Sequence, residues 1–333
     1  MRSERARPIF VVGSPRSGTS ILTWCLGHHP NIFPVPESNW MGDFAVNVGV
    51  AYQIGAARGD YSILSAMHIT ADQLSAAFGE TINSLILAHR DHLEKNREAR
   101  CVEKNLDRRW LEGSSRAVGP KERWVDGTPE YSFHICGLRK LFPEARFVHL
   151  FRDVREVVRS MIHFHRVAGV QLVANEEEAY RYWMRTVSAC LLAEQAYGPT
   201  VVHRIRYQDL VNNAESAMRS VLVFLGEDYS ERCLEPLQLR INSSSALDDF
   251  QTDHTSNQVM IEQALQLSKQ TEQNPPPSKD SSAAADELEA DFQQRVSYMS
   301  TIDSAFQKSQ QTIEALNKSV AGTVSATTLS ERL

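Results

Sequence analysis

The chain has 333 residues and a formal net charge of −6 at pH 7, with 35 Lys and Arg against 41 Asp and Glu. This length allows one large domain plus an appendage, and the acidic balance argues against a nucleic-acid partner. The five cysteines never form a C-x-x-C pair, which indicates reduced thiols. The 11 histidines are mostly isolated, and the pairs His28 with His29 and His163 with His165 have no cysteine or carboxylate at metal-ligand spacing, so we expect no metal site.

Residues 8–22 predict an anion-binding site. The apolar run Ile9 to Val12 predicts a buried strand, Gly13 to Gly18 a loop, and Thr19 the start of a helix. Backbone N–H groups and the helix dipole converge in such a unit. The spacing Gly13-x4-Gly18 is typical of nucleotide-phosphate loops, but Thr19 stands where a Walker loop has its Lys. The cation inside the loop is Arg16, which favours a phosphate ester over the Mg²⁺-dependent chemistry of a kinase.

The following 100 residues carry fewer signals. Pro30 to Pro36 predicts an extended segment that leads to Glu37. Residues 39–67 have no clear pattern and contain several glycines. Thr70 is predicted to cap a long helix that ends near Arg97.

A second anion-binding element follows in the middle of the chain. From Arg139 to Arg166 there are seven Lys and Arg against three acids. Arg146 to Phe151 predicts a buried strand, and a helix is predicted from Val154 to Arg166. Arg152 stands at the carboxyl end of the strand, where open α/β sheets bind ligands.

These two segments resemble the donor-binding motifs of sulfotransferases that use 3′-phosphoadenosine 5′-phosphosulfate. Pro15-Arg16-Ser17-Gly18-Thr19-Ser20 resembles their 5′-phosphosulfate loop, and Arg152 with Ser160 eight residues later resembles their 3′-phosphate motif. Weaker matches are Tyr207-Gln208-Asp209-Leu210 and Phe224-Leu225-Gly226. The resemblance implies an α/β, P-loop-like, three-layer fold with a central parallel sheet.

The resemblance also implies a chemistry: in-line transfer of a sulfuryl group to a hydroxyl acceptor, without a metal. Arg16 would serve both binding and catalysis, Glu37 would be the general base, and His134 is the alternative base. Residues 39–67 would contribute to the acceptor pocket. The implied donor contacts are Arg16, Ser17, Gly18, Thr19, Ser20, Arg152, Ser160 and, in a loop that resembles the nucleotide-closing loop of bacterial relatives, Ser243.

One position departs from the family pattern. In Val125-Asp126-Gly127-Thr128-Pro129, Gly127 stands where many relatives carry a Lys beside the phosphosulfate. Either Arg16 suffices there, or another cation approaches from elsewhere in the fold.

The predicted domain of residues 1–250 is followed by a different kind of sequence. Residues 251–283 are rich in polar residues and proline and predict a linker. Residues 284–321 predict an amphipathic helix with apolar residues every seven positions, and 322–333 a flexible end. The helix could fold back on its own subunit or form a coiled coil with a second copy. The apolar heptad positions are Leu288, Phe292, Met299, Ile302, Phe306, Ile313, Leu316 and Val320, and Arg295 and Ser309 interrupt the pattern.

The sequence leaves the acceptor open among a carbohydrate, a lipid, a tyrosine and a small metabolite. It also leaves open a non-catalytic alternative, a nucleotide-binding scaffold that acts through its helical tail. The chain contains no run of about 18 apolar residues and no space for a cleavable apolar segment before Ile9, so we expect a cytoplasmic protein without a membrane span.

Overall fold

The computed structural model describes residues 7–103, 121–238 and 257–330. In this part of the chain, five parallel strands form one sheet in the order β2-β3-β1-β4-β5. Chain connections run to opposite sides of β1, so the crevice between the carboxyl ends of β1 and β4 is the expected ligand position of such a sheet. The strands are β1 (Ile9–Val12), β2 (Ile32–Pro34), β3 (Arg123–Asp126), β4 (Arg146–Phe151) and β5 (Val202–Arg206).

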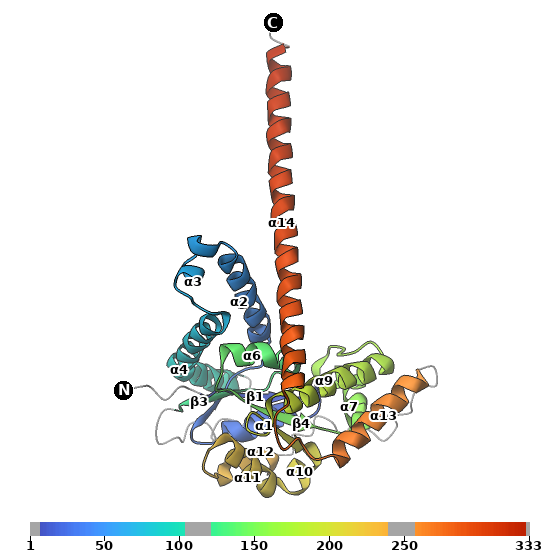
Figure 1. Cartoon of the computed structure of the whole chain (residues 1–333). Helices are drawn as coiled ribbons and strands as arrows, with labels where there is room; N and C mark the ends of the chain where they lie inside the picture. Colours follow the sequence, from blue (N-terminus) through green and yellow to red (C-terminus); the bar gives the residue numbers. More distant parts are fainter. Residues whose placement is uncertain (1–6, 104–120, 239–256, 331–333) are drawn as a thin grey trace.

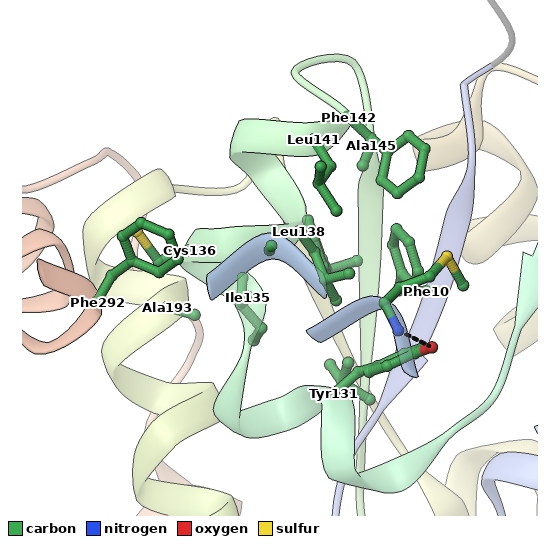
Figure 2. Close-up of a cluster of buried hydrophobic side chains, with 14 of the residues drawn as sticks. Phe10, Tyr131, Ile135, Cys136, Leu138, Leu141, Phe142, Ala145, Ala193 and Phe292 are labelled. Atoms are coloured by element: carbon green, nitrogen blue, oxygen red, sulfur yellow. Dashed lines mark hydrogen bonds between the residues drawn. The ribbon is translucent and has the colours of Figure 1, made fainter. Parts of the chain in front are cut away.

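Alternate residues of β1 face opposite sides of the sheet, and both sides are covered by helices (Figure 1). On one side the Phe10 ring lies 5.3 Å from that of Phe147 and 5.4 Å from that of Trp124, measured between centroids. Figure 2 shows Phe10 in this cluster, with Phe292 from the last helix at its margin. The helices on this side are α2 (Trp40–Ala56), α4 (Ala71–Glu103), α6 (Ile135–Leu141), α9 (Glu176–Tyr197) and the first part of α14 (Ser282–Ser330).

The other face of the sheet packs Ile9 and Val11 of β1 against a second group of helices. These are α1 (Thr19–Gly27), α10 (Tyr207–Asn212), α11 (Ala214–Leu225) and the 3-10 helix η3 (Glu231–Leu234), which is followed by α12 (Glu235–Gln238). The result is the three-layer α/β architecture that the sequence predicted.

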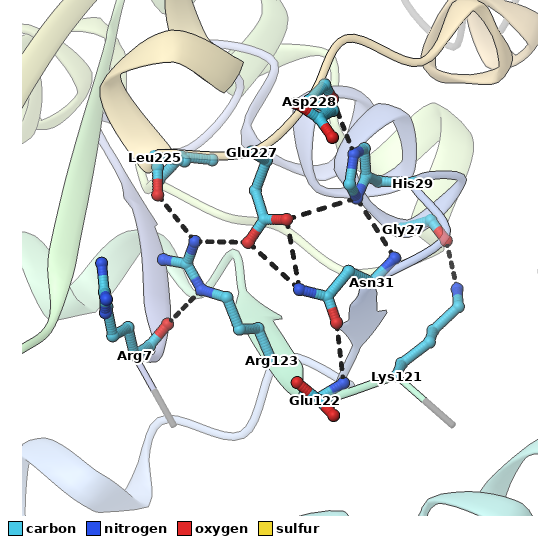
Figure 3. A network of polar contacts seen from close by, with 10 residues as sticks. All are labelled: Arg7, Gly27, His29, Asn31, Lys121, Glu122, Arg123, Leu225, Glu227 and Asp228. Carbon is cyan, nitrogen blue, oxygen red and sulfur yellow. Dashed lines mark hydrogen bonds and ion pairs between the residues drawn. The ribbon is translucent and has the colours of Figure 1, made fainter. Parts of the chain in front are cut away.

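A buried ion pair holds loops together at the amino-terminal edge of the sheet (Figure 3). Arg123 Nη1 donates to Glu227 Oε1 at 2.7 Å, and the two side chains are 8% and 11% exposed. Asn31 and His29 complete the network around Glu227. These contacts join β3, the turn after α1 and the end of α11, at the end of the sheet away from the predicted anion loop.

Residues 39–67 are more regular than the sequence indicated. They form α2, the 3-10 helix η1 (Gly59–Tyr61) and α3 (Ile63–Ala66). The glycines of α2 allow close packing: a Cβ on Gly42 would lie 2.5 Å from the His134 ring, and one on Gly49 would lie 2.8 Å from Val296. The predicted helix from Thr70 is confirmed as α4, and Thr70 and Gln73 exchange capping hydrogen bonds.

Two further segments also differ from expectation. The helix after Arg152 ends at Ile162 as α7 (Val154–Ile162), and α8 (His165–Ala168) is separate. Within residues 251–283, where a linker was predicted, α13 (Gln258–Gln273) buries Met260 and Ile261 against α7 and α9. The division of the chain into domains stays a prediction.

Candidate active site

The loop from Gly13 to Gly18 connects β1 to α1 in a conformation that turns sharply under the helix. Arg16 has a φ of 71° and Gly18 a φ of 106°, both in the left-handed region. A Cβ on Gly18 would lie 2.7 Å from the Tyr207 ring, so this position requires glycine. No side chain caps α1 at Gly18, and the amino end of the helix keeps its partial positive charge for an anion.

Ser17 gives independent evidence for a ligand at this loop. The side chain is 1% exposed, yet its Oγ has no hydrogen-bond partner among the described residues. A buried hydroxyl without a partner is costly. A phosphate or sulfate oxygen in the loop would accept a hydrogen bond from this hydroxyl, so the observed donor set fits an anionic ester.

The second predicted motif meets the loop in space. Arg16 Nε donates to Ser160 Oγ at 3.2 Å, although 144 positions separate the two residues. Arg152 Nη1 donates to the backbone oxygen of Arg16 at 3.1 Å, and the Arg152 guanidinium lies 4.2 Å from the Tyr207 ring centroid. Burial, and next to it the charge of Arg152, lower the pKa of Arg16. Two cations are therefore held close together at the carboxyl ends of β1 and β4.

Arg152 also has an acidic partner. Its Nε donates to Glu156 Oε2 at 2.8 Å, one turn further along α7, and Gln208 donates to the other oxygen of Glu156. These bonds orient the guanidinium toward the loop.

Glu37 lies at the same site, on the segment between β2 and α2. Its Oε1 accepts a hydrogen bond from Ser20 Oγ at 2.8 Å. This bond holds the carboxylate beside the first turn of α1. Burial, with a smaller contribution from the charge of Glu130, raises the pKa of Glu37, and the Ser20 hydrogen bond and Arg16 oppose that change. A carboxylate with a raised pKa beside an anion site can act as a general base.

A chain of hydrogen bonds that begins at the buried Asp126 and Thr128 fixes the segment that carries Glu37. The backbone N–H of Ser38 donates to Thr128 Oγ1 at 3.0 Å, and Thr128 Oγ1 donates to Asp126 Oδ1 at 2.6 Å. Ser38 Oγ donates to Asp126 Oδ2 at 3.3 Å. Asp126 is fully buried, and burial raises its pKa to about 6. Sequence reasoning did not assign Asp126, Thr128 and Ser38, although the first two flank Gly127 at the end of β3.

Gly127 itself cannot carry the lysine of the family pattern. A Cβ there would lie 2.1 Å from Thr23 Oγ1 and 3.1 Å from Thr23 Cβ. The close approach of α1 to the end of β3 therefore makes any side chain at this position sterically unfavourable.

The alternative base, His134, packs beside α2. The His134 ring packs against Gly42 of α2, and burial and the nearby Arg295 of α14 lower its pKa.

Ser243 lies outside the described residues. In the part of the chain that the structure covers, no group of three or more His, Cys, Asp or Glu side chains could hold a metal ion. No helix of the described ranges is both long enough and apolar enough to cross a bilayer.

Fold and site together define a class: an α/β protein with a candidate anion site at the carboxyl edge of a parallel sheet and a carboxylate beside it. Comparison with known proteins narrows this class. Residues 8–231 match the model described as "Sulfotransferase family", and the chain belongs to that family.

Individual relatives are distant. A "Putative protein-tyrosine sulfotransferase" of Caenorhabditis briggsae is 21% identical over 273 residues, which cover 78% of this chain and 80% of that protein. The "Omega-hydroxy-beta-dihydromenaquinone-9 sulfotransferase Stf3" of Mycobacterium bovis is 28% identical over 142 residues, which cover 40% of this chain and 35% of that protein. Among solved structures, the sulfotransferase domain of the Synechococcus PCC 7002 olefin synthase aligns with 17% identity and a TM-score of 0.42, over 90% of this chain and 96% of that domain.

Proposed function

We propose that the protein transfers a sulfuryl group from 3′-phosphoadenosine 5′-phosphosulfate to a hydroxyl acceptor, with Glu37 as the general base. One observation carries this proposal: a hydrogen bond from Ser20 holds Glu37 beside the loop of Arg16. At the same site, the Ser17 hydroxyl has no hydrogen-bond partner among the described residues. Membership of the sulfotransferase family supports the type of reaction.

The donor would be held at two places. Arg16, Ser17, Gly18, Thr19 and Ser20 would hold its 5′ end through backbone N–H groups, hydroxyls and one guanidinium. Arg152 and Ser160 would hold the 3′-phosphate, and Ser243 remains a proposed further contact. When bound, such a donor supplies an electrophilic sulfur and a phosphate leaving group.

Glu37 would accept the proton of the acceptor hydroxyl as that oxygen attacks. Its raised pKa brings its basicity closer to that needed at neutral pH than an ordinary Glu would have. Arg16, which is fixed by Ser160, would stabilise the negative charge that develops on the transferred group and the leaving phosphate. No step requires a metal ion.

The acceptor is proposed only as a hydroxyl compound. The names of two relatives specify a protein tyrosine and an ω-hydroxylated menaquinone, and both acceptors present a hydroxyl group.

The experiment that tests the proposal compares Glu37→Gln with Glu130→Gln. The first variant keeps shape and hydrogen bonding but removes the base, so turnover should fall about 10²-fold or more, while affinity for 3′-phosphoadenosine 5′-phosphate holds. The control removes the neighbouring carboxylate and should keep most of the turnover. Wild-type turnover in Glu37→Gln refutes the role of this residue. Nucleotide binding without sulfuryl transfer to any class of hydroxyl acceptor would favour the scaffold alternative.

A further inference from the structure

The last helix changes its relation to the rest of the protein halfway along its length. Its first part, residues 282–296, packs on the body of the protein: Ala284, Phe292 and Val296 are each less than 10% exposed. From Tyr298 onward the helix extends away from the body (Figure 1). Residues 298–330 add about 50 Å at 1.5 Å per residue. We call these two parts the docked section and the projecting section.

The spacing of apolar residues changes at the same point. In the docked section they recur every four residues, at Ala284, Leu288, Phe292 and Val296. The Phe292 ring would lie 2.9 Å from a Cβ on Gly137, and Val296 contacts Gly49, so this face fits α6 and α2. Arg295, which interrupts the heptad pattern, donates from Nη1 to the backbone oxygen of Phe133 at 2.5 Å. The docked section therefore packs its apolar face against its own subunit.

In the projecting section the spacing alternates between three and four residues. Apolar residues occupy these positions except at Ser309. The side chains of Met299, Ile302, Phe306, Ile313 and Leu316 are exposed, from 39% for Met299 to 60% for Phe306 and Leu316. The alternation runs over three heptads in the sequence and is the pattern of a helix that packs along another helix in a coiled coil. The positions are Met299, Ile302, Phe306, Ser309, Ile313, Leu316 and Val320.

We call this row of apolar residues the stripe. The residues beside the stripe indicate which helix covers it. Between Met299 and Val320, the positions that flank a coiled-coil stripe hold Ala305, Gln310, Thr312, Asn317 and Ser319, and Asp303 is the one charged residue among the flanking positions. Such flanks carry no charge pattern that would select a differently charged partner or repel an identical helix. A helix this long with few charges and an exposed apolar stripe gains its stability from pairing.

We propose that the projecting section pairs in parallel with the projecting section of a second copy, so that the protein is a homodimer joined through α14. Parallel, in-register pairing places Ser309 opposite Ser309 in one polar layer and keeps every other layer between Met299 and Val320 apolar. An antiparallel arrangement would place each Ser309 against an apolar side chain. The docked section fixes α14 to the body, and the two catalytic bodies would then lie at the same end of the paired helices.

The first test measures the mass of the full chain by light scattering. We expect twice the mass of one chain for the wild type, and the mass of one chain for Phe306→Glu with Ile313→Glu. The matched control, Ser304→Glu with Gln311→Glu, adds the same charges on the outer face of the helix and should stay dimeric. A single-chain mass for the wild type at all concentrations, or an unchanged mass in the stripe variant, overturns the proposal. Nucleotide affinity should be the same in all three proteins, since the changes lie outside the anion site.

The second test addresses orientation. Under mild oxidation, Ser309→Cys should form a covalent dimer because parallel pairing brings the two positions together, and Ser304→Cys should not. The wild type, treated in the same way, corrects for the native thiols, of which Cys25, Cys136, Cys190 and Cys233 are buried. A dimer in which Ser309→Cys is not cross-linked overturns the parallel arrangement.

Discussion

The hydroxyl of Thr128 provides the sharpest test of how the base is positioned. Thr128 is 2% exposed, and its Oγ1 makes two bonds: it accepts from the backbone N–H of Ser38 at 3.0 Å and donates to Asp126 at 2.6 Å. Thr128→Val keeps the shape of the side chain and removes both bonds. The change leaves the backbone N–H of Ser38, the residue that follows Glu37, without this acceptor, and Asp126 Oδ1 keeps only the bond from the backbone N–H of residue 128.

The expected cost follows from these two bonds. A neutral hydrogen bond contributes about 0.5–1.5 kcal/mol and one to a charged group about 1.5–3 kcal/mol, so the free energy of unfolding should fall by about 2–4 kcal/mol. The segment that carries Glu37 is then held by fewer contacts. A displacement of the base by about 1 Å would reduce turnover on the order of 10²-fold.

Stability and turnover are measured separately, by urea unfolding and by steady-state kinetics at saturating donor. Thr128→Ser is the matched control because it restores the hydroxyl, and it should recover most of the turnover lost in Thr128→Val. If Thr128→Val loses stability while its turnover and donor affinity stay at wild-type values, the chain of bonds is structural and does not position Glu37.

Two further predictions concern the ends of β3 and α1. Asp126 has a pKa raised by burial from 3.8 to about 6, so it stabilises the fold when protonated, and this contribution is lost as the pH rises from about 4 through 6. The free energy of unfolding of the wild type relative to Asp126→Asn should therefore fall by up to about 3 kcal/mol between pH 4 and 7, and a pH-independent difference in urea unfolding would contradict this. Gly127→Ala places a methyl 2.1 Å from Thr23 Oγ1 and should cost about 1–3 kcal/mol. The cost should be smaller in a Thr23→Ala background, and equal thermal shifts in both backgrounds would refute the clash.

The parts of the fold that sequence predicted well are those determined by local pattern. Ile9 to Val12 is apolar at every position because β1 is covered on both faces, and such a run reads as a buried strand without knowledge of its neighbours. The hydrogen bond from Arg16 to Ser160 is a long-range contact, and only the resemblance to sulfotransferase motifs had assigned the two residues to one donor site.

The parts that sequence missed depend on contacts between distant segments. The glycines of α2 suggested irregular structure, yet they accommodate His134 and Val296, which lie far along the chain. In α13, Asn257 caps the helix by accepting from the N–H of Met260 at 3.2 Å. That signal was present in the sequence, but the polar composition around it obscured a helix with one buried face.

Gly127 stands where many relatives carry a lysine, and this difference affects the electrostatics of the site. Because α1 approaches the end of β3 closely at this position, the positive charge identified at the candidate site comes from Arg16 in the loop and Arg152 at the end of β4. The two guanidinium groups repel each other, as the effect of Arg152 on the pKa of Arg16 indicates, and each one attracts an anion placed near it. A ligand with one anionic group can satisfy only one of them fully. A nucleotide with separate 5′ and 3′ anionic groups can satisfy both, and this arrangement of charge is the physical basis on which we expect the site to distinguish such a donor from nucleotides that carry a single phosphate cluster.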